Sequence, residues 1–307
     1  METRKIGSLE VSVVGLGCNN FGRRLDAACS ATVIHAALDA GITFFDTADS
    51  YGDSQSETIL GRALGRRRDD VVIATKFGNP IEGQGQGASA EYIRRAVEAS
   101  LRRLGTDRID LYQLHKPDPA VPIEETLGAL DELVQAGKVR EIGCSNFSIE
   151  QLRAAEAVVE DDAARFESVQ NEYSLLQRDA EREVLPFCER QGLAFLPYYP
   201  LASGLLTGKY RQEEPVPEGT RISLDFYSGW LNEENLARVE ALIGFAEARG
   251  HTILELAFSW LLRWPSVASV IAGATSPRQV QANAAAAGWQ LTEADLAEID
   301  AIAYHGA

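Results

Sequence analysis

The fold of this protein is decided by Gly41-Ile-Thr-Phe-Phe-Asp46-Thr-Ala-Asp-Ser-Tyr51-Gly52, where a short apolar run passes directly into polar residues. The apolar run, Thr43–Phe45, has the β-branched and aromatic content of a buried strand. Segments of helical period stand on both sides of it, at Ala28–Ala40 and Glu57–Gly65. The stretch therefore predicts a strand between two helices, with polar side chains at the carboxyl end of the strand.

The same alternation repeats along all 307 residues. The apolar runs are Val11–Leu16, Thr43–Phe45, Val71–Ala74, Ile109–Leu114, Val139–Cys144, Ser168–Gln170, Ala194–Pro197 and Val267–Ile271. The helix-like segments include Ala28–Ala40, Glu57–Gly65, Glu91–Leu104, Ile123–Gly137, Ile149–Val159, Glu181–Gln191 and Leu236–Arg249. Eight strands that alternate with helices predict a parallel sheet closed into a (β/α)₈ TIM barrel.

Three further features complete the predicted fold. Glycines that favour the left-handed position after a helix stand at Gly41, Gly65, Gly105, Gly137, Gly192 and Gly250. The stretch Arg4–Val13, with a turn at Gly7-Ser8, predicts an N-terminal hairpin, and Thr292–Ala303 predicts a C-terminal extra helix. Since no low-complexity linker divides the chain, we expect residues 1–307 to form a single domain.

Charge narrows the range of partners. The chain has 29 Lys and Arg against 45 Asp and Glu, a formal net charge of −16. An acidic chain repels phosphate backbones and anionic membranes, which argues against nucleic-acid or membrane binding. The basic runs Arg66–Arg68 and Arg102-Arg103 close helix-like segments, and we expect them to be solvated helix ends.

Metal sites and disulfides are not predicted. The cysteines lack CxxC spacing and the histidines are scattered, at Cys18, Cys29, Cys144, Cys188, His35, His115, His251 and His305. The N-terminus has no apolar signal segment, and no stretch reaches about 18 apolar residues. The sequence therefore favours a soluble cytoplasmic protein.

Two partial nucleotide motifs do not fit their contexts. Gly15-Leu-Gly17-Cys-Asn-Asn20 has Asn20 where a dinucleotide fingerprint needs its third glycine. Tyr112 and Lys116 have the Tyr-x-x-x-Lys spacing of short-chain dehydrogenases, but they lie on a strand-like run. Residues four apart on a strand are far from each other, so a joint catalytic role is not expected.

Five blocks follow one another along the chain: Gly41–Gly52 with Glu57 and Leu60-Gly61, Leu101–His115, Gly137–Phe147, Leu196–Tyr210, and Ile271–Pro277 with Asn283. Together they resemble the signature segments of the aldo-keto reductases, from about Gly7 to Leu296. This resemblance implies an NADP-dependent oxidoreductase that transfers hydride between the cofactor and an aldehyde, ketone or sugar substrate, or the corresponding alcohol.

The resemblance further implies a catalytic tetrad of Asp46, Tyr51, Lys76 and His115. Carbonyl reduction needs a proton at oxygen, and a tyrosine with its usual pKa of about 10 is a weak acid at neutral pH. We expect Lys76 to lower the pKa of Tyr51, and Asp46 to keep Lys76 charged. His115 would donate a hydrogen bond to the substrate oxygen.

For the cofactor, the resemblance implies NADP(H), favoured over NAD(H). It places Ser145, Asn146 and Gln170 at the nicotinamide carboxamide and Tyr198 on the ring face. The pyrophosphate segment would comprise Pro200, Leu201, Ser203, Gly204 and Lys209. Some relatives carry a lysine and an arginine at the positions of Gly273 and Gln279, which leaves Ser276, Arg278, Gln279 and Asn283 for the 2′-phosphate.

The substrate and the physiological role stay open. Candidates for an aromatic substrate wall are Phe21, Phe226, Tyr227 and Trp230. One alternative is an NADP-binding regulatory subunit similar to the potassium-channel β subunits, and another is a phosphosugar isomerase on the same barrel. An oxidoreductase would turn over an aldehyde with NADPH. A regulatory subunit would bind the nucleotide without turnover, and an isomerase would not bind it.

Overall fold

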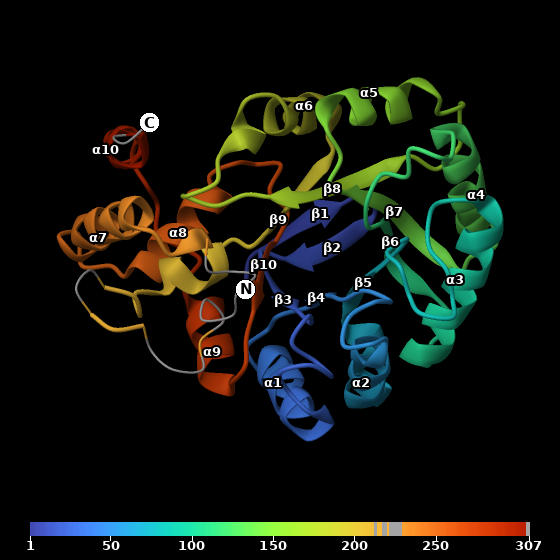
Figure 1. The fold of residues 1–307 in the computed structure, drawn as a ribbon, viewed down its shortest axis with the longest axis horizontal. Helices are drawn as coiled ribbons and strands as arrows, with labels where there is room; N and C mark the ends of the chain where they lie inside the picture. The colour runs from blue at the N-terminus through green and yellow to red at the C-terminus, as the bar shows by residue number, and fades with distance from the viewer. Residues whose placement is uncertain (212–213, 217–219, 221–228, 305–307) are drawn as a thin grey trace.

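The computed structural model describes residues 1–211, 214–216, 220 and 229–304, and its centre is one parallel sheet of eight strands (Figure 1). In sheet order the strands are β10 (Val270–Gly273), β3 (Val14–Gly17), β4 (Phe44–Asp46), β5 (Val72–Phe77), β6 (Ile109–Leu114), β7 (Val139–Ser145), β8 (Phe166–Glu172) and β9 (Ala194–Tyr198). The predicted (β/α)₈ barrel is confirmed.

The barrel closes just before β10 begins. The Phe195 amide of β9 donates to Ser266 O at 2.7 Å, and the Ala268 amide donates back to Phe195 O at 3.1 Å. The predicted run Val267–Ile271 is therefore not one strand. Its first residues pair with β9 and close the barrel, and its last two residues belong to β10.

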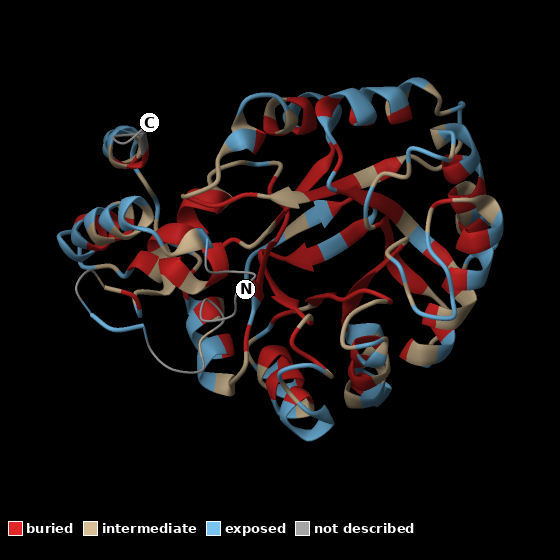
Figure 2. Ribbon diagram, viewed as in Figure 1, coloured by how far each residue is buried: buried red, intermediate tan, exposed pale blue. Residues whose placement is uncertain are grey.

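Helices form the outer layer around the sheet (Figure 1). They are α1 (Ala27–Asp39), α2 (Gln55–Leu64), α3 (Ala90–Leu104), α4 (Ile123–Gln135), α5 (Ile149–Ala157), α6 (Val184–Gln191), α7 (Glu233–Glu247), α8 (Ile253–Leu262), α9 (Pro277–Ala285) and α10 (Glu293–Tyr304). Figure 2 shows the buried residues on the strands and on the inward helix faces, as amphipathic helices require. The extra helix α10 was predicted, whereas α8 and α9 were not among the predicted segments.

The N-terminal hairpin closes one end of the barrel. Its strands, β1 (Thr3–Ile6) and β2 (Leu9–Ser12), pair antiparallel, and Leu9 and Val11 pack against Phe44 and Leu111 inside the barrel. Phe44 is the first residue of β4, so the hairpin covers the amino ends of the strands. The carboxyl ends, where the predicted site residues lie, face the opposite end.

One strand prediction was wrong in its limits. The run Val11–Leu16 is not a single strand, because β2 ends at Ser12 and β3 begins at Val14. Ser12 pairs with Thr3 of β1, while Val14 pairs with Val270 of β10. Both pieces are apolar and buried, so the hydrophobicity of the sequence does not reveal where the pairing partner changes.

The expectation that both basic runs are solvated helix ends was wrong for one arginine in each run. Arg68 pairs with the buried Asp110 at 2.7 Å, and its side chain is only 12% exposed. Arg103 pairs with Glu57 at 2.6 Å, and the Glu57 side chain is 0% exposed. These two arginines hold buried carboxylates, whereas Arg66, Arg67 and Arg102 are exposed as predicted.

Glycine occurs after helices where the backbone requires it. All six predicted positions have positive φ: Gly41 at 79°, Gly65 at 48°, Gly105 at 64°, Gly137 at 71°, Gly192 at 65° and Gly250 at 76°. A side chain in this conformation is strained, so glycine ends these helices at low cost.

Candidate active site

The four predicted catalytic residues meet at the carboxyl ends of three neighbouring strands. Asp46 is the last residue of β4, Lys76 lies on β5, and His115 follows β6. Tyr51 comes from the loop between β4 and α2. The centroids of the Tyr51 and His115 rings are 5.9 Å apart, and Lys76 Nζ lies 5.2 Å from the Tyr51 centroid.

A buried ion pair forms the floor of this group. Lys76 Nζ donates to Asp46 Oδ1 at 2.8 Å, to Asp46 Oδ2 at 2.7 Å and to the Thr47 carbonyl at 3.0 Å. Burial lowers the pKa of Lys76, but Asp46 and then Tyr51 raise it, and the net pKa is above its usual value. Lys76 is therefore a fixed ammonium ion at neutral pH.

Tyr51 is held by a loop whose backbone is attached to β5. The Thr47 amide donates to Ala74 O at 2.8 Å, and the Asp49 amide donates to Lys76 O at 3.0 Å. Gly52 has φ of 58°, and a Cβ there would collide with the Phe21 carbonyl oxygen. A glycine directly after Tyr51 therefore lets the loop turn tightly against its neighbour.

The net effect on the Tyr51 pKa differs from our expectation. Lys76 does lower the pKa, but burial has the larger effect, and the pKa of Tyr51 is raised above its usual value. The phenol is consequently protonated throughout the neutral range. That is the form needed to donate a proton to a carbonyl oxygen.

His115 is neutral at this site. Burial, together with the charges of Lys76 and Lys116, lowers the pKa of His115 to about 3. Its backbone is held from both sides, because the His115 amide donates to Phe77 O at 2.8 Å and Asn146 Nδ2 donates to His115 O at 2.9 Å. A neutral imidazole can donate one hydrogen bond to a substrate without adding charge.

The residues expected at the nicotinamide form one connected network beside the tetrad. Tyr198 Oη donates to Asn146 Oδ1 at 2.8 Å, and Asn146 Nδ2 donates to Ser145 Oγ at 3.1 Å. Ser145 Oγ in turn donates to Gln170 O at 2.7 Å, and Gln170 Nε2 donates to Asp46 Oδ1 at 2.9 Å. Gln170 therefore also supports the ion pair, a contact that the sequence did not predict.

The segment expected at the pyrophosphate has features that suit a phosphate group. Pro200 and Leu201 lead into a 3₁₀ segment, Ala202–Thr207, in which Ser203 and Gly204 have positive φ. Ser203 Oγ is buried with no hydrogen-bond partner among the described residues. A Cβ at Gly204 would lie 3.1 Å from Lys209 Nζ. An unpartnered hydroxyl and an ammonium group beside a glycine backbone fit a bound phosphate oxygen.

The predicted 2′-phosphate residues lie where β10 passes into α9. Gly273 ends β10, Ser276 caps α9 by accepting from the Gln279 amide at 3.3 Å, and Asn283 is buried within the helix. Gln279 Oε1 accepts from the Thr275 amide at 2.7 Å. A helix N-terminus of this kind favours a bound anion.

The structure describes only two of the four candidate residues for the aromatic substrate wall. Phe21 is fully buried in the core, which leaves no surface for a substrate, so its assignment is not carried forward. Trp230 is half-buried and packs against the core before α7. Phe226 and Tyr227 lie outside the described residues.

Two polar residues at the site were missed. Gln113 was hidden in an apolar run, and its Nε2 lies 3.4 Å from Asp46 Oδ1. Asp49 stood in the polar segment after β4, and neither of its buried oxygens has a hydrogen-bond partner among the described residues. Burial and then Glu57 raise the pKa of Asp49 to about 7.

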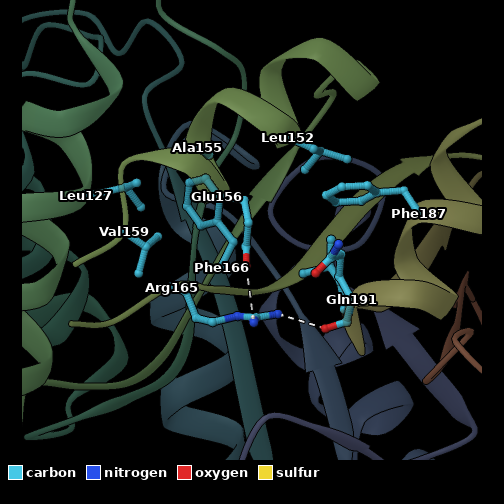
Figure 3. A pocket seen from close by; sticks show the side chains of 10 residues that line it. Leu127, Leu152, Ala155, Glu156, Val159, Arg165, Phe166, Phe187 and Gln191 are labelled. Atoms are coloured by element: carbon cyan, nitrogen blue, oxygen red, sulfur yellow. Dashed lines mark hydrogen bonds and ion pairs between the residues drawn. The ribbon is translucent and has the colours of Figure 1, made fainter. Parts of the chain in front are cut away.

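A small cleft lies between α4, α5 and α6, beside the first residue of β8 (Figure 3). Apolar side chains such as Leu127 and Phe187 line it, and Arg165 crosses it to Glu156 Oε1 at 3.4 Å and Gln191 O at 3.0 Å. Its volume of about 10 Å³ holds at most one water molecule. We regard it as a packing gap between helices.

The described residues contain neither a candidate metal centre nor a candidate membrane span. No group of three or more His, Cys, Asp or Glu side chains there could hold a metal ion. In the same part of the chain, no helix is both long and apolar enough to cross a bilayer.

Comparisons with known proteins agree with the geometry. A profile of the aldo/keto reductase family matches residues 13–304. The aldo-keto reductase YhdN of Bacillus subtilis is 39% identical over 304 residues, covering 96% of this chain and 90% of that protein. A probable voltage-gated potassium channel subunit beta of Arabidopsis thaliana is 35% identical over 301 residues, covering 92% of this chain and 90% of that protein.

A solved structure agrees as well. The glycerol dehydrogenase of Gluconobacter oxydans superposes with a TM-score of 0.85 at 33% identity, covering 98% of this chain and 94% of that chain.

Proposed function

We propose that this chain, which belongs to the aldo/keto reductase family, is an NADP(H)-dependent oxidoreductase that reduces small aldehydes or ketones, or oxidises the corresponding alcohols or sugars. The observation that carries this proposal is the buried ammonium of Lys76, held by Asp46 and placed beside the Tyr51 ring. Such an arrangement suits a tyrosine that donates a proton and then has to be stabilised as a phenolate.

Tyr51, Lys76 and His115 each have a separate task in carbonyl reduction. A nicotinamide cofactor, when bound, would supply hydride to the carbonyl carbon. Tyr51 would donate its phenolic proton to the carbonyl oxygen, so the product would be an alcohol. Lys76 stabilises the negative charge that this leaves on Tyr51, and His115 orients the substrate oxygen. In alcohol oxidation the same residues act in reverse.

The residues expected around the cofactor support NADP(H) as its identity. Ser145, Asn146 and Tyr198 already form a hydrogen-bonded edge beside His115. Ser203 and Lys209 offer a hydroxyl and a cation to the pyrophosphate. We expect the α9 N-terminus to receive the 2′-phosphate, with Ser276 and Arg278 as polar contacts.

Steady-state turnover tests the proposal. Purified protein should consume NADPH in the presence of 4-nitrobenzaldehyde and produce one alcohol for each NADPH oxidised. Tyr51→Phe is the matched control, because it removes one hydroxyl and leaves the cofactor contacts in place. Absence of turnover with every aldehyde, ketone and polyol of a broad panel would overturn the enzyme assignment.

The second candidate is an NADP-binding regulatory subunit. The similarity to the probable potassium channel subunit beta of Arabidopsis thaliana is the observation that favours it. Tight NADPH binding without steady turnover would support this candidate.

A further inference from the structure

Asn79 contacts one ring nitrogen of the proposed catalytic histidine, His115. It lies in the loop after β5, three residues beyond Lys76, and its Nδ2 is 3.0 Å from His115 Nδ1. Among the described residues, this is the only hydrogen bond that the imidazole makes, so Nε2 is the nitrogen left for a substrate.

The contact determines which nitrogen carries the proton. A neutral imidazole has one N–H donor and one acceptor nitrogen, and an amide nitrogen can only donate. Since Asn79 Nδ2 donates, His115 Nδ1 is the acceptor and Nε2 carries the hydrogen. His115 is neutral here, because burial and two lysines lower its pKa to about 3.

We propose that Asn79 is a positioning residue that holds His115 in its Nε2–H tautomer, so that His115 presents a hydrogen-bond donor to the substrate oxygen. The inference rests on the proposed function for its catalytic consequence. In the other tautomer, Nε2 would present a lone pair to the lone pairs of a carbonyl oxygen. The substrate would then lose an orienting hydrogen bond and meet a repulsive contact instead.

The same chain holds a histidine with the opposite arrangement. His251 Nδ1 lies 3.1 Å from Glu255 Oε1 at the start of α8. A carboxylate oxygen accepts, so a neutral His251 carries its hydrogen on Nδ1. His251 therefore serves as an internal reference for a spectroscopic test.

Long-range ¹H–¹⁵N correlation NMR of ¹⁵N-histidine-labelled protein reads the tautomer directly and needs no substrate. We expect His115 to show a protonated Nε2 and an unprotonated Nδ1, with the reverse at His251. Because the chain has four histidines, assignment uses His35→Gln, His305→Gln and Glu255→Gln, and the last of these also serves as a control distant from the tetrad. A wild-type spectrum with hydrogen on Nδ1 of His115 would overturn the proposal.

Two variants separate tautomer control from a merely structural role. Asn79→Asp is isosteric but can only accept, so it should move the His115 hydrogen to Nδ1 and lower kcat at least 100-fold. Asn79→Leu removes the donor without imposing the wrong tautomer, and it should lower kcat by about 10-fold or less. A structural role predicts the opposite order, because aspartate preserves the shape and leucine does not.

The pH profile gives a second readout. Asn79→Asp places a carboxylate at Nδ1 and should raise the His115 pKa, so the remaining activity should acquire a new dependence on pH. If Asn79→Asp keeps the wild-type tautomer and kcat, the proposal fails. If wild-type protein turns over no carbonyl at all, the proposed function fails, while the NMR spectrum still decides the tautomer.

Discussion

The ammonium of Lys76 and the carboxylate of Asp46 are joined by two hydrogen bonds, of 2.8 and 2.7 Å, at a depth where Lys76 is 0% and Asp46 is 4% exposed. Two charges buried this deeply are tolerated only when they are paired and further hydrogen-bonded. The Thr47 carbonyl, Gln113 and Gln170 supply those additional bonds. The pair is therefore both a structural element and the base of the proposed catalytic group.

Tyr51→Phe should abolish carbonyl reduction and leave NADPH affinity nearly unchanged. The change removes the proton donor, which is typically worth about 10²- to 10⁴-fold in rate, and it removes no predicted cofactor contact. NADPH consumption with 4-nitrobenzaldehyde and a fluorescence titration of NADPH measure the two quantities. A variant that keeps most of its turnover would show that another group donates the proton.

Lys76→Met should eliminate activity and also destabilise the fold. Removing one partner of a buried ion pair costs about 3–5 kcal/mol, because the remaining charge is left unpaired. Asp46→Asn/Lys76→Met should therefore recover part of the unfolding free energy lost in Lys76→Met, while remaining inactive. Urea unfolding of the three proteins gives the comparison, and a double variant less stable than Lys76→Met would contradict the pairing.

Arg103→Leu should destabilise the protein far more than Arg102→Leu, although the two residues are neighbours. Arg103 Nε donates to Glu57 Oε2 at 2.6 Å, and Glu57 is fully buried, whereas Arg102 is exposed. We expect a loss of about 3–5 kcal/mol at Arg103 and a change within about 0.5 kcal/mol at Arg102. Equal effects in urea unfolding would mean that Glu57 does not depend on its arginine.

Asp49→Asn should become increasingly stabilising as the pH rises. Burial and then Glu57 raise the pKa of Asp49 from 3.8 to about 7. The folded state thus binds this proton more tightly than the unfolded state, so wild-type stability falls between about pH 4 and pH 7. At about 1.4 kcal/mol per pKa unit, the pH-dependent difference reaches at most about 4 kcal/mol.

Unfolding at pH 5 and pH 8 measures this difference. Because asparagine does not ionise, the stability of Asp49→Asn relative to wild type should be greater at pH 8. The same relative stability at both pH values would show that Asp49 titrates alike in the folded and unfolded states.

Residues at strand ends were predictable from the sequence, because parallel strands bring their carboxyl ends together. Asp46, Lys76 and His115 follow this rule, and the structure brings them together with Tyr51. The roles assigned to them in catalysis and cofactor binding stay predictions. Their side-chain partners were less predictable: Asn79, in the loop after β5, contacts His115, which follows β6 and lies 36 positions later in the chain.

The sequence could not show how deeply each charged side chain is buried. Helical periodicity tells which side of its own helix a residue occupies, but not which group lies in the layer below. For this reason Arg103 was predicted to be solvated, although it forms an ion pair with the buried Glu57. The pKa of Tyr51 likewise depends on burial, which outweighs the charge of Lys76 and is visible only in three dimensions.

The last prediction concerns the choice of nucleotide. We expect this protein to favour NADPH over NADH by less than a relative that carries a cation at both of the positions held here by Gly273 and Gln279. A charged hydrogen bond to phosphate contributes about 1.5–3 kcal/mol, or about 10- to 150-fold in affinity. Arg278 is exposed in the first turn of α9 and is the one Lys or Arg within that helix.

Gln279→Arg should tighten NADPH by at least about 10-fold and leave NADH unchanged, because only NADPH carries the 2′-phosphate. The Gln279 side chain accepts from the Thr275 amide at 2.7 Å, but Ser276 still caps α9, so the helix start should survive the change. Arg278→Ala should narrow the preference if Arg278 contacts the phosphate. Fluorescence titration of both nucleotides against the three proteins decides the matter. Equal tightening of NADH and NADPH by Gln279→Arg would mean that this side chain never meets the 2′-phosphate.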